Sequence, residues 1–149
     1  MQGIALDLTK VHILRIDPNE DVLLAVRSYV QATGITQAIV LGGYGTLAAH
    51  HLHWVKDNRI PAANTFGRGQ GGIEILAMNG TVVEGQPHIH VTLSTPQGAY
   101  GGHLEEGCRA YVLCEVFLGE VSGATLKRVP THVDVPDMGS GDIPRLVSL

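Results

Sequence analysis

The chain has 149 residues, of which 44% are hydrophobic and 16% charged, and its formal net charge is −4 at pH 7. These values are typical of one folded globular domain and exclude an intrinsically disordered chain. They also provide no basic face for a phosphate backbone, so a nucleic-acid partner is not expected.

The lengths of the apolar runs and the number of cysteines indicate in which cellular compartment the protein is expected. The longest apolar stretches, such as residues 111–118, are far shorter than a membrane span. The N-terminus lacks the basic and apolar regions of a signal peptide. The two cysteines give no disulfide framework and fit a reducing compartment. We therefore expect a cytoplasmic protein without a membrane segment.

The first predicted elements are a strand over residues 11–17 and the helix that follows it. Asp17 can cap this helix, the next residue is a proline that suits a first turn, and Glu20 completes a capping-box-like pattern. The helix is predicted to run to about Thr33 and to end at Gly34.

The middle of the chain is predicted as two strands, a glycine turn and a long loop. Residues 37–41 and 46–55 form the strands, and the glycine-rich residues 42–45 form the turn between them. Residues 56–72 are rich in Gly, Asn and Pro and are predicted as a loop. A G-x-G-x-x-G match at residues 67–72 has no strand before it and no helix after it, so a dinucleotide site is rejected.

The second half of the chain is predicted as β-structure. Residues 73–78 and 81–83 flank Asn79-Gly80, which is the strongest short signal for a hairpin turn. Further strands are predicted at residues 88–94, with alternate apolar residues facing the core, and at residues 109–118.

The expected fold is of the α+β class. Many strands and few helices, without regular strand–helix alternation, predict a single domain over residues 1–149 with a largely antiparallel twisted sheet. Its core is expected at about residues 11–128. Residues 130–149 are polar, contain spaced Pro and Gly, and are expected to form a weakly ordered tail.

A pattern of histidines gives the strongest indication of function. Side chains two apart on a strand share a face, so His88 and His90 stand side by side, and the turn at residues 95–98 can bring His103 back toward them. Three imidazoles are a ligand set for zinc or another divalent metal, with one position left open for water or substrate. Because the chain has eight histidines, hydrogen-bonded histidines near a sheet edge are the alternative.

A second group of histidines lies at residues 50–53. Only His51 and His53 share a strand face, and no nearby acidic residue completes a site. His50, His51 and His53 are therefore predicted to lie at an interface or on an exposed strand face. The cupin pattern also uses His-x-His, but it requires a Glu where this chain has Ser94 and Thr95.

Several carboxylates could serve a metal-bound water as general acid or base. The main candidates are Glu74, Glu105 and Glu115, and further ones are Glu84 and Glu106. Glu74 and Glu115 lie within apolar strands, where a charge usually has a partner or a function. An ion pair with Arg109 or Arg128 is the alternative. The G-x-S-x-G motif of serine hydrolases is absent from the sequence.

Several motifs together resemble the plants-and-prokaryotes conserved (PPC) domain. They are the Ile-Glu-Ile-Leu and Asn-Gly of residues 73–80, the His-x-His of residues 88–94, the Gly-Gly-His-Leu of residues 101–104, and Glu115-Val116. The opening strand and capped helix also fit. The resemblance covers roughly residues 11–128, and its most specific part is the combination of His-x-His with Gly-Gly-His.

This resemblance implies an α+β domain that assembles as a homotrimer. It also implies a metal, typically zinc, bound near subunit interfaces by the three histidines of the pattern, here His88, His90 and His103. Plant members follow AT-hook motifs that bind A·T-rich DNA, and bacterial relatives are often named DNA-binding proteins. This chain has Gly67-Arg68-Gly69 in place of the Arg-Gly-Arg core of an AT-hook. It also lacks the Arg-Phe of the plant domain at Gly72-Ile73.

Three hypotheses follow for the function. The first is a trimeric metal-binding protein that takes a small anionic ligand or a protein partner at or near the metal. The second is a zinc-dependent hydrolase or lyase, in which a Glu shuttles the proton of a metal-bound water. The third is a DNA-binding or transcription-associated protein, which the naming of relatives supports and the net charge does not. A carboxylate within reach of an open coordination position would favour the enzyme.

Overall fold

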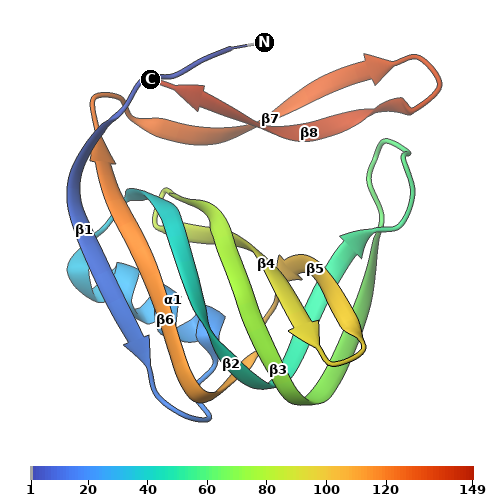
Figure 1. The fold of residues 1–149 in the computed structure, drawn as a ribbon. Helices are drawn as coiled ribbons and strands as arrows, with labels where there is room; N and C mark the ends of the chain where they lie inside the picture. Colours follow the sequence, from blue (N-terminus) through green and yellow to red (C-terminus); the bar gives the residue numbers. More distant parts are fainter. Residues whose placement is uncertain (1) are drawn as a thin grey trace.

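The computed structural model describes residues 2–149, and within them the chain forms eight strands and one helix (Figure 1). In chain order they are β1 (Asp7–Ile16), α1 (Val22–Thr33), β2 (Gln37–Val55), β3 (Asn64–Val83), β4 (Gln86–Thr95), β5 (Gly98–Leu104), β6 (Arg109–Ser122), β7 (Leu126–Val135) and β8 (Gly139–Ser148). No helix among these residues is long and apolar enough to cross a membrane.

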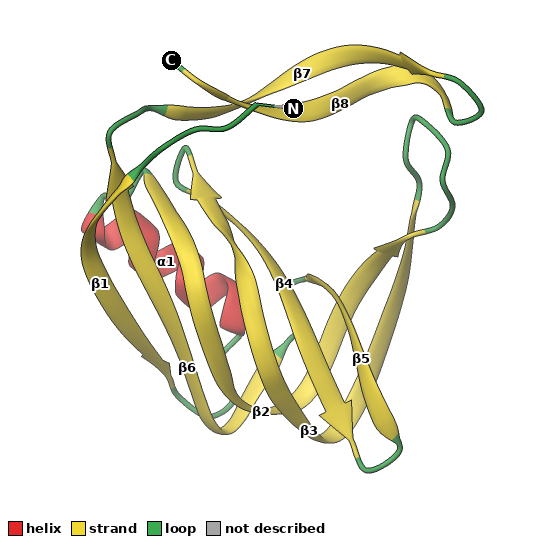
Figure 2. Cartoon of the chain, turned by 45° about the horizontal axis from the view of Figure 1, so that its top comes forward, coloured by secondary structure: helices red, strands yellow, loops and turns green. Residues whose placement is uncertain are grey.

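Six strands form one curved antiparallel sheet in the order β1-β6-β2-β3-β4-β5. The far edge folds back on the sheet, because β5 pairs with the end of β2 at Leu52↔Leu104 and His53↔His103. β2 is 19 residues long, so it can pair with β3 and β6 and still reach β5. The strand β1 lies at the free edge, and α1 lies along one face of the sheet (Figure 2). The predicted α+β fold with one largely antiparallel sheet is confirmed.

The core lies between α1 and the sheet. The helix places Val22, Val26 and Val30 into it, each with an exposed fraction of 1% or less. Strand β4 alternates as predicted, with its apolar residues Ile89 and Leu93 fully buried and its histidines on the opposite face. Full burial of one such aliphatic side chain contributes about 1.5–3 kcal/mol. The core therefore fixes the face of β4 on which the histidines stand.

The helix begins later than the sequence predicted. Asp21 rather than Asp17 is the N-cap, and its side chain accepts a hydrogen bond from a backbone N–H of the first turn at 3.1 Å. The residues before it form a turn at 18–19, where Asn19 has a φ of 68°, and residues 19–20 exchange backbone hydrogen bonds with Ala110 of β6. Gly34, with a φ of 71°, ends the helix as predicted.

Two predicted turns are parts of continuous strands. Residues 42–45 lie inside β2, where shifts of register bend the strand against β6. Asn79-Gly80 lies inside β3, and the hairpin turn is at Glu84-Gly85, both of which have positive φ. Gly80 is needed for a different reason, since a side chain at its φ of 152° would collide with the carbonyl oxygen of His88.

The predicted loop of residues 56–72 is much shorter in the structure, because β3 begins at Asn64. The G-x-G-x-x-G residues therefore lie in a strand. A side chain at Gly67 would meet the ring of Trp54, and one at Gly69 would meet the ring of His50. These glycines make room for aromatic rings of β2 rather than flexibility for a loop.

The C-terminal residues do not form the expected weakly ordered tail. They form the hairpin β7–β8, which pairs from Leu126↔Ser148 to Val135↔Gly139 and lies across one end of the sheet (Figure 1). Leu126 is buried at the base of the hairpin. Near its tip, Met138 accepts a hydrogen bond from the backbone of Ile60 in the β2–β3 loop at 2.9 Å. Attachment at both ends supports a hairpin that would be marginal alone.

Candidate metal centre

Histidines from three strands lie in one row across the sheet. His53 of β2 is directly opposite His103 of β5, and His103 is directly opposite His90 of β4. Residues that face each other in antiparallel strands project to the same side, so these imidazoles share one face. His88 stands two residues from His90 on that face. The closure of β5 onto β2 thus brings four histidines together.

The three histidines that the sequence singled out are in contact. Nε2 of His88 lies 3.2 Å from Nε2 of His90. The ring centroid of His103 is 4.5 Å from that of His88 and 5.4 Å from that of His90. The predicted turn of residues 95–98 does return β5 beside β4, so the strand geometry expected from the sequence is present.

His53 and Glu105 complete the cluster. Nδ1 of His53 lies 2.6 Å and Nδ1 of His103 lies 3.1 Å from the same Oε1 atom of Glu105. One ligand atom from each of these three residues lies within 4.8 Å of the others. The expectation that no acidic residue accompanies His53 is therefore wrong. No local signal could have shown it, since the contact depends on the pairing of β2 with β5.

His50 and His51 have other surroundings. Nδ1 of His51 lies 2.8 Å from the carbonyl oxygen of Glu106, which holds its ring at the β5–β6 turn. The ring of His50 packs beside Tyr100 with centroids 5.2 Å apart. Burial, and then the proximity of His51, lower the pKa of His50. Neither residue contacts the three predicted ligands through a hydrogen bond in residues 2–149.

Of the main carboxylate candidates, Glu105 lies at the cluster and the other two lie elsewhere. Glu74 is exposed on β3. Glu115 accepts a hydrogen bond from the hydroxyl of Tyr44 at 2.6 Å, and this contact raises the pKa of Tyr44. Neither makes the ion pair considered above: Arg109 donates to a backbone carbonyl, and Arg128 donates to a threonine hydroxyl.

The cluster favours neutral imidazoles. The pKa of His88 falls from 6.5 to about 4, chiefly because its ring is partly withdrawn from water and further because of charge on His103 and Arg128. Burial also lowers the pKa of His103. Burial alone would raise the pKa of Glu105, but hydrogen bonds with His53 and His103 lower it overall. A neutral ring with a free lone pair is the form that binds a metal.

The donor set fits a divalent transition metal. Imidazole nitrogens suit zinc, and three of them leave a coordination position open. Glu105 occupies the Nδ1 side of His103, so Nε2 of that ring is left for the side shared with His88 and His90. A carboxylate behind a histidine is the usual second partner of a metal-ligating ring.

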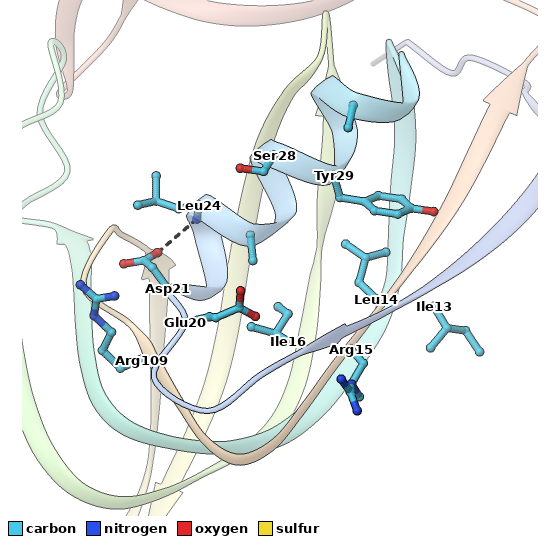
Figure 3. Close-up of a pocket in the computed structure, with 12 residues that line it drawn as sticks. Ile13, Leu14, Arg15, Ile16, Glu20, Asp21, Leu24, Ser28, Tyr29 and Arg109 are labelled. Carbon is cyan, nitrogen blue, oxygen red and sulfur yellow. Dashed lines mark hydrogen bonds between the residues drawn. The ribbon is translucent and has the colours of Figure 1, made fainter.

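A groove of about 670 Å³ lies elsewhere on the molecule, between α1 and the edge strand β1 (Figure 3). Its lining includes Leu24 and Tyr29 of the helix and Arg15 of the strand. Close to it, His12 bridges the hydroxyl of Tyr29 at 2.9 Å and Glu120 at 3.3 Å. The groove contains none of the cluster histidines.

The model of the Plants and Prokaryotes Conserved (PCC) domain family matches residues 5–122 of the chain. The chain belongs to this family. The PCC match spans β1 to β6 and contains the whole histidine cluster, whereas the β7–β8 hairpin lies beyond it.

Solved structures share the fold of this PCC domain. A plant- and prokaryote-conserved (PPC) protein from Pyrococcus horikoshii is 25% identical with a TM-score of 0.73, over 97% of this chain and 99% of that one. A metal-containing protein from Archaeoglobus fulgidus is 23% identical with a TM-score of 0.72, over 95% of this chain and 97% of that one.

Curated relatives are much longer than this PCC protein. The bifunctional protein GlmU of a Synechococcus strain is 25% identical over 122 residues, which are 81% of this chain and 19% of the relative. The chain thus spans about a fifth of the length of the curated relatives it matches.

Proposed function

We propose that this PCC domain binds a divalent metal, zinc in the first place, through His88, His90 and His103. The observation that carries the proposal is the mutual contact of the three rings, with two Nε2 atoms 3.2 Å apart. Such an approach of two unprotonated nitrogens is unfavourable unless a proton or a cation lies between them. The description of the Archaeoglobus relative as metal-containing adds support.

Glu105 and His53 are proposed to orient this ligand set from the Nδ1 side of His103. Glu105 holds the Nδ1 side of His103 at 3.1 Å and so selects the tautomer whose Nε2 lone pair is available. His53 contributes a second ring to the same carboxylate at 2.6 Å. The chain therefore presents preoriented nitrogens, and a small ligand or a protein partner would meet them from the exposed side of β4.

Elemental analysis of protein purified without a metal-affinity tag tests the proposal. We expect about one zinc per chain, lost in His103→Ala and in His90→Ala. His132→Ala on the C-terminal hairpin is the matched control, because this histidine is remote in sequence and contacts Asp142 and Ser140. Wild-type protein without metal, or equal metal in all variants, would contradict the proposal.

A second candidate function is a zinc-dependent hydrolase or lyase, and the position of Glu105 favours it. A bound divalent ion would lower the pKa of a coordinated water and polarise a substrate oxygen. Glu105 lies on the Nδ1 side of the rings, so it would take up or return a proton through the ring of His53, which it contacts and which is not among the three proposed ligands. The enzyme hypothesis expects that Glu105→Gln, compared at saturating metal, abolishes turnover while the metal stays bound.

Self-association into a trimer in the cytoplasm is the third part of the proposal. The face of the sheet turned away from α1 exposes apolar residues on adjacent strands, among them Ile13, Leu41 and Leu113. Such a contiguous apolar surface is typical of a contact with another chain. The family resemblance gives three as the expected number of copies.

Cys108 and Cys114 are both buried and unpaired, which suits a reducing compartment.

A further inference from the structure

A cationic side chain from the C-terminal hairpin reaches the histidine cluster. Arg128 belongs to β7, and its Nη2 donates a hydrogen bond to Oγ1 of Thr81 at 2.9 Å. Thr81 is directly opposite His88 in the pairing of β3 with β4, so both side chains project to the same face. The guanidinium is therefore held on the face of the sheet that carries the histidine cluster.

Most of the hydrogen-bonding capacity of Arg128 is uncommitted. A guanidinium carries five N–H donors in a planar fork. Within residues 2–149 the Arg128 side chain bonds to Thr81 and forms no ion pair with a carboxylate. The planar fork can bind two oxygens of a carboxylate in a bidentate manner, and phosphate offers the same geometry. A half-buried arginine without an acidic partner therefore indicates that its anion comes from outside the chain.

The charge of the cluster agrees with an anionic ligand. The carboxylate of Glu105 is engaged by His53 and His103 and lies on their Nδ1 side. On the exposed side, a divalent ion and Arg128 would together leave an excess of positive charge. Asn79, opposite His90, adds an uncharged polar group there. An anionic ligand would neutralise this positive charge.

We propose that the site binds a small carboxylate, held between the guanidinium of Arg128 and the metal that His88, His90 and His103 hold. The inference rests on the proposed metal site and adds to it a class of ligand and the residue that recognises it. Arg128 lies outside the residues 5–122 matched by the family model, so ligand recognition is supplied by the hairpin of this chain.

Titration of the cobalt(II)-substituted protein with acetate and with imidazole, followed by visible absorption, tests the inference. Both probes are expected to perturb the spectrum of the wild type. In Arg128→Gln, acetate should bind on the order of ten- to a hundredfold more weakly, as expected for a lost charge-assisted hydrogen bond. Imidazole is uncharged and should bind as before. Arg128→Lys should retain part of the acetate affinity, because it keeps the charge but loses the fork.

Arg145→Gln is the matched control, since it removes the same charge from an exposed position on the paired strand β8. Thr81→Val keeps Arg128 but removes its hydrogen bond, and it should weaken acetate binding with less risk to folding. Equal acetate affinity in wild type, Arg128→Gln and Thr81→Val would overturn the inference and leave the metal site standing. Absence of a cobalt spectrum in the wild type would overturn both. Tighter Arg128-dependent binding of inorganic phosphate than of acetate would overturn the carboxylate class.

Discussion

His103 lies directly opposite His53 where β5 pairs with β2, and the two imidazole rings stack with their centroids 4.3 Å apart. Both rings turn their Nδ1 atoms to one oxygen of Glu105. A single carboxylate therefore orients two rings that belong to different strands, β2 and β5. Orientation by a carboxylate restricts the rotamer and the tautomer of a ligand before the metal binds.

Removal of this carboxylate is predicted to weaken metal binding without abolishing it. Glu105→Ala should lower zinc affinity by about 10- to 100-fold, because His103 loses the partner of its Nδ1. Competition with a chromogenic chelator measures the change. Glu106→Ala is the control, since its carboxylate pairs with Arg27 and not with the cluster. Equal zinc affinity in wild type and Glu105→Ala would show that the carboxylate does not support the site.

Acidification is predicted to destabilise the metal-free protein through His88. The pKa of this ring is about 4 in the folded state and 6.5 ordinarily. Between these values the unfolded chain binds a proton that the folded chain does not, so the free energy of unfolding falls as the pH falls. Because the side chain is exposed in part, we expect a loss on the order of 1 kcal/mol.

Urea unfolding in a chelator, at about pH 7 and about pH 4.5, measures this loss. His88→Asn removes the titrating group and should reduce the difference between the two conditions. The same difference in wild type and variant would assign the acid sensitivity to other groups.

The local pattern of the sequence was sufficient for β4 and for the turn that follows it. Strict alternation buries Ile89 and Leu93 and leaves His88 and His90 on the other face. The turn that follows reverses the chain with His103 facing His90. These contacts join residues fewer than about twenty positions apart, where pleat and turn chemistry determine the geometry.

The contribution of His53 could not be predicted in this way. Its contact with His103 requires that the edge of the sheet fold back, so that β5 pairs with the end of β2 as well as with β4. That closure depends on the curvature of the whole sheet and on long-range pairs such as Leu52↔Leu104. The hairpin that carries Arg128 was missed for a related reason, since its polar strands are held at their ends by distant segments.

Gly80 illustrates an ambiguity that sequence alone does not resolve. Asn-Gly favours a tight turn because glycine accepts positive φ, but glycine is also required where two backbones approach closely. At position 80 the second requirement holds, because the residue faces the carbonyl of His88 inside a continuous strand.

Substitution of this glycine in β3 is predicted to disturb the proposed metal centre on the neighbouring strand β4. Gly80→Ala should destabilise the fold by about 1–3 kcal/mol, since the new methyl group cannot be accommodated without moving β4. Urea unfolding measures the stability, and zinc affinity should fall with it because His88 moves. Gly72→Ala in the same strand meets no atom within 4 Å and should be close to neutral. A neutral Gly80→Ala would contradict the close approach.

A charge on the apolar face of the sheet is predicted to dissociate the proposed trimer. Ile13 is 67% exposed on β1 and faces Phe117 of β6, beside Val11 and the exposed apolar residues of β2. An interface that buried this surface would have to desolvate the ammonium of Ile13→Lys, which costs several kcal/mol without a partner. Sedimentation velocity should then show a monomer. Val55→Lys is the control, because Val55 is equally exposed but lies at the far end of β2. A wild-type monomer, or a trimer unaffected by Ile13→Lys, would exclude this face as the contact between copies.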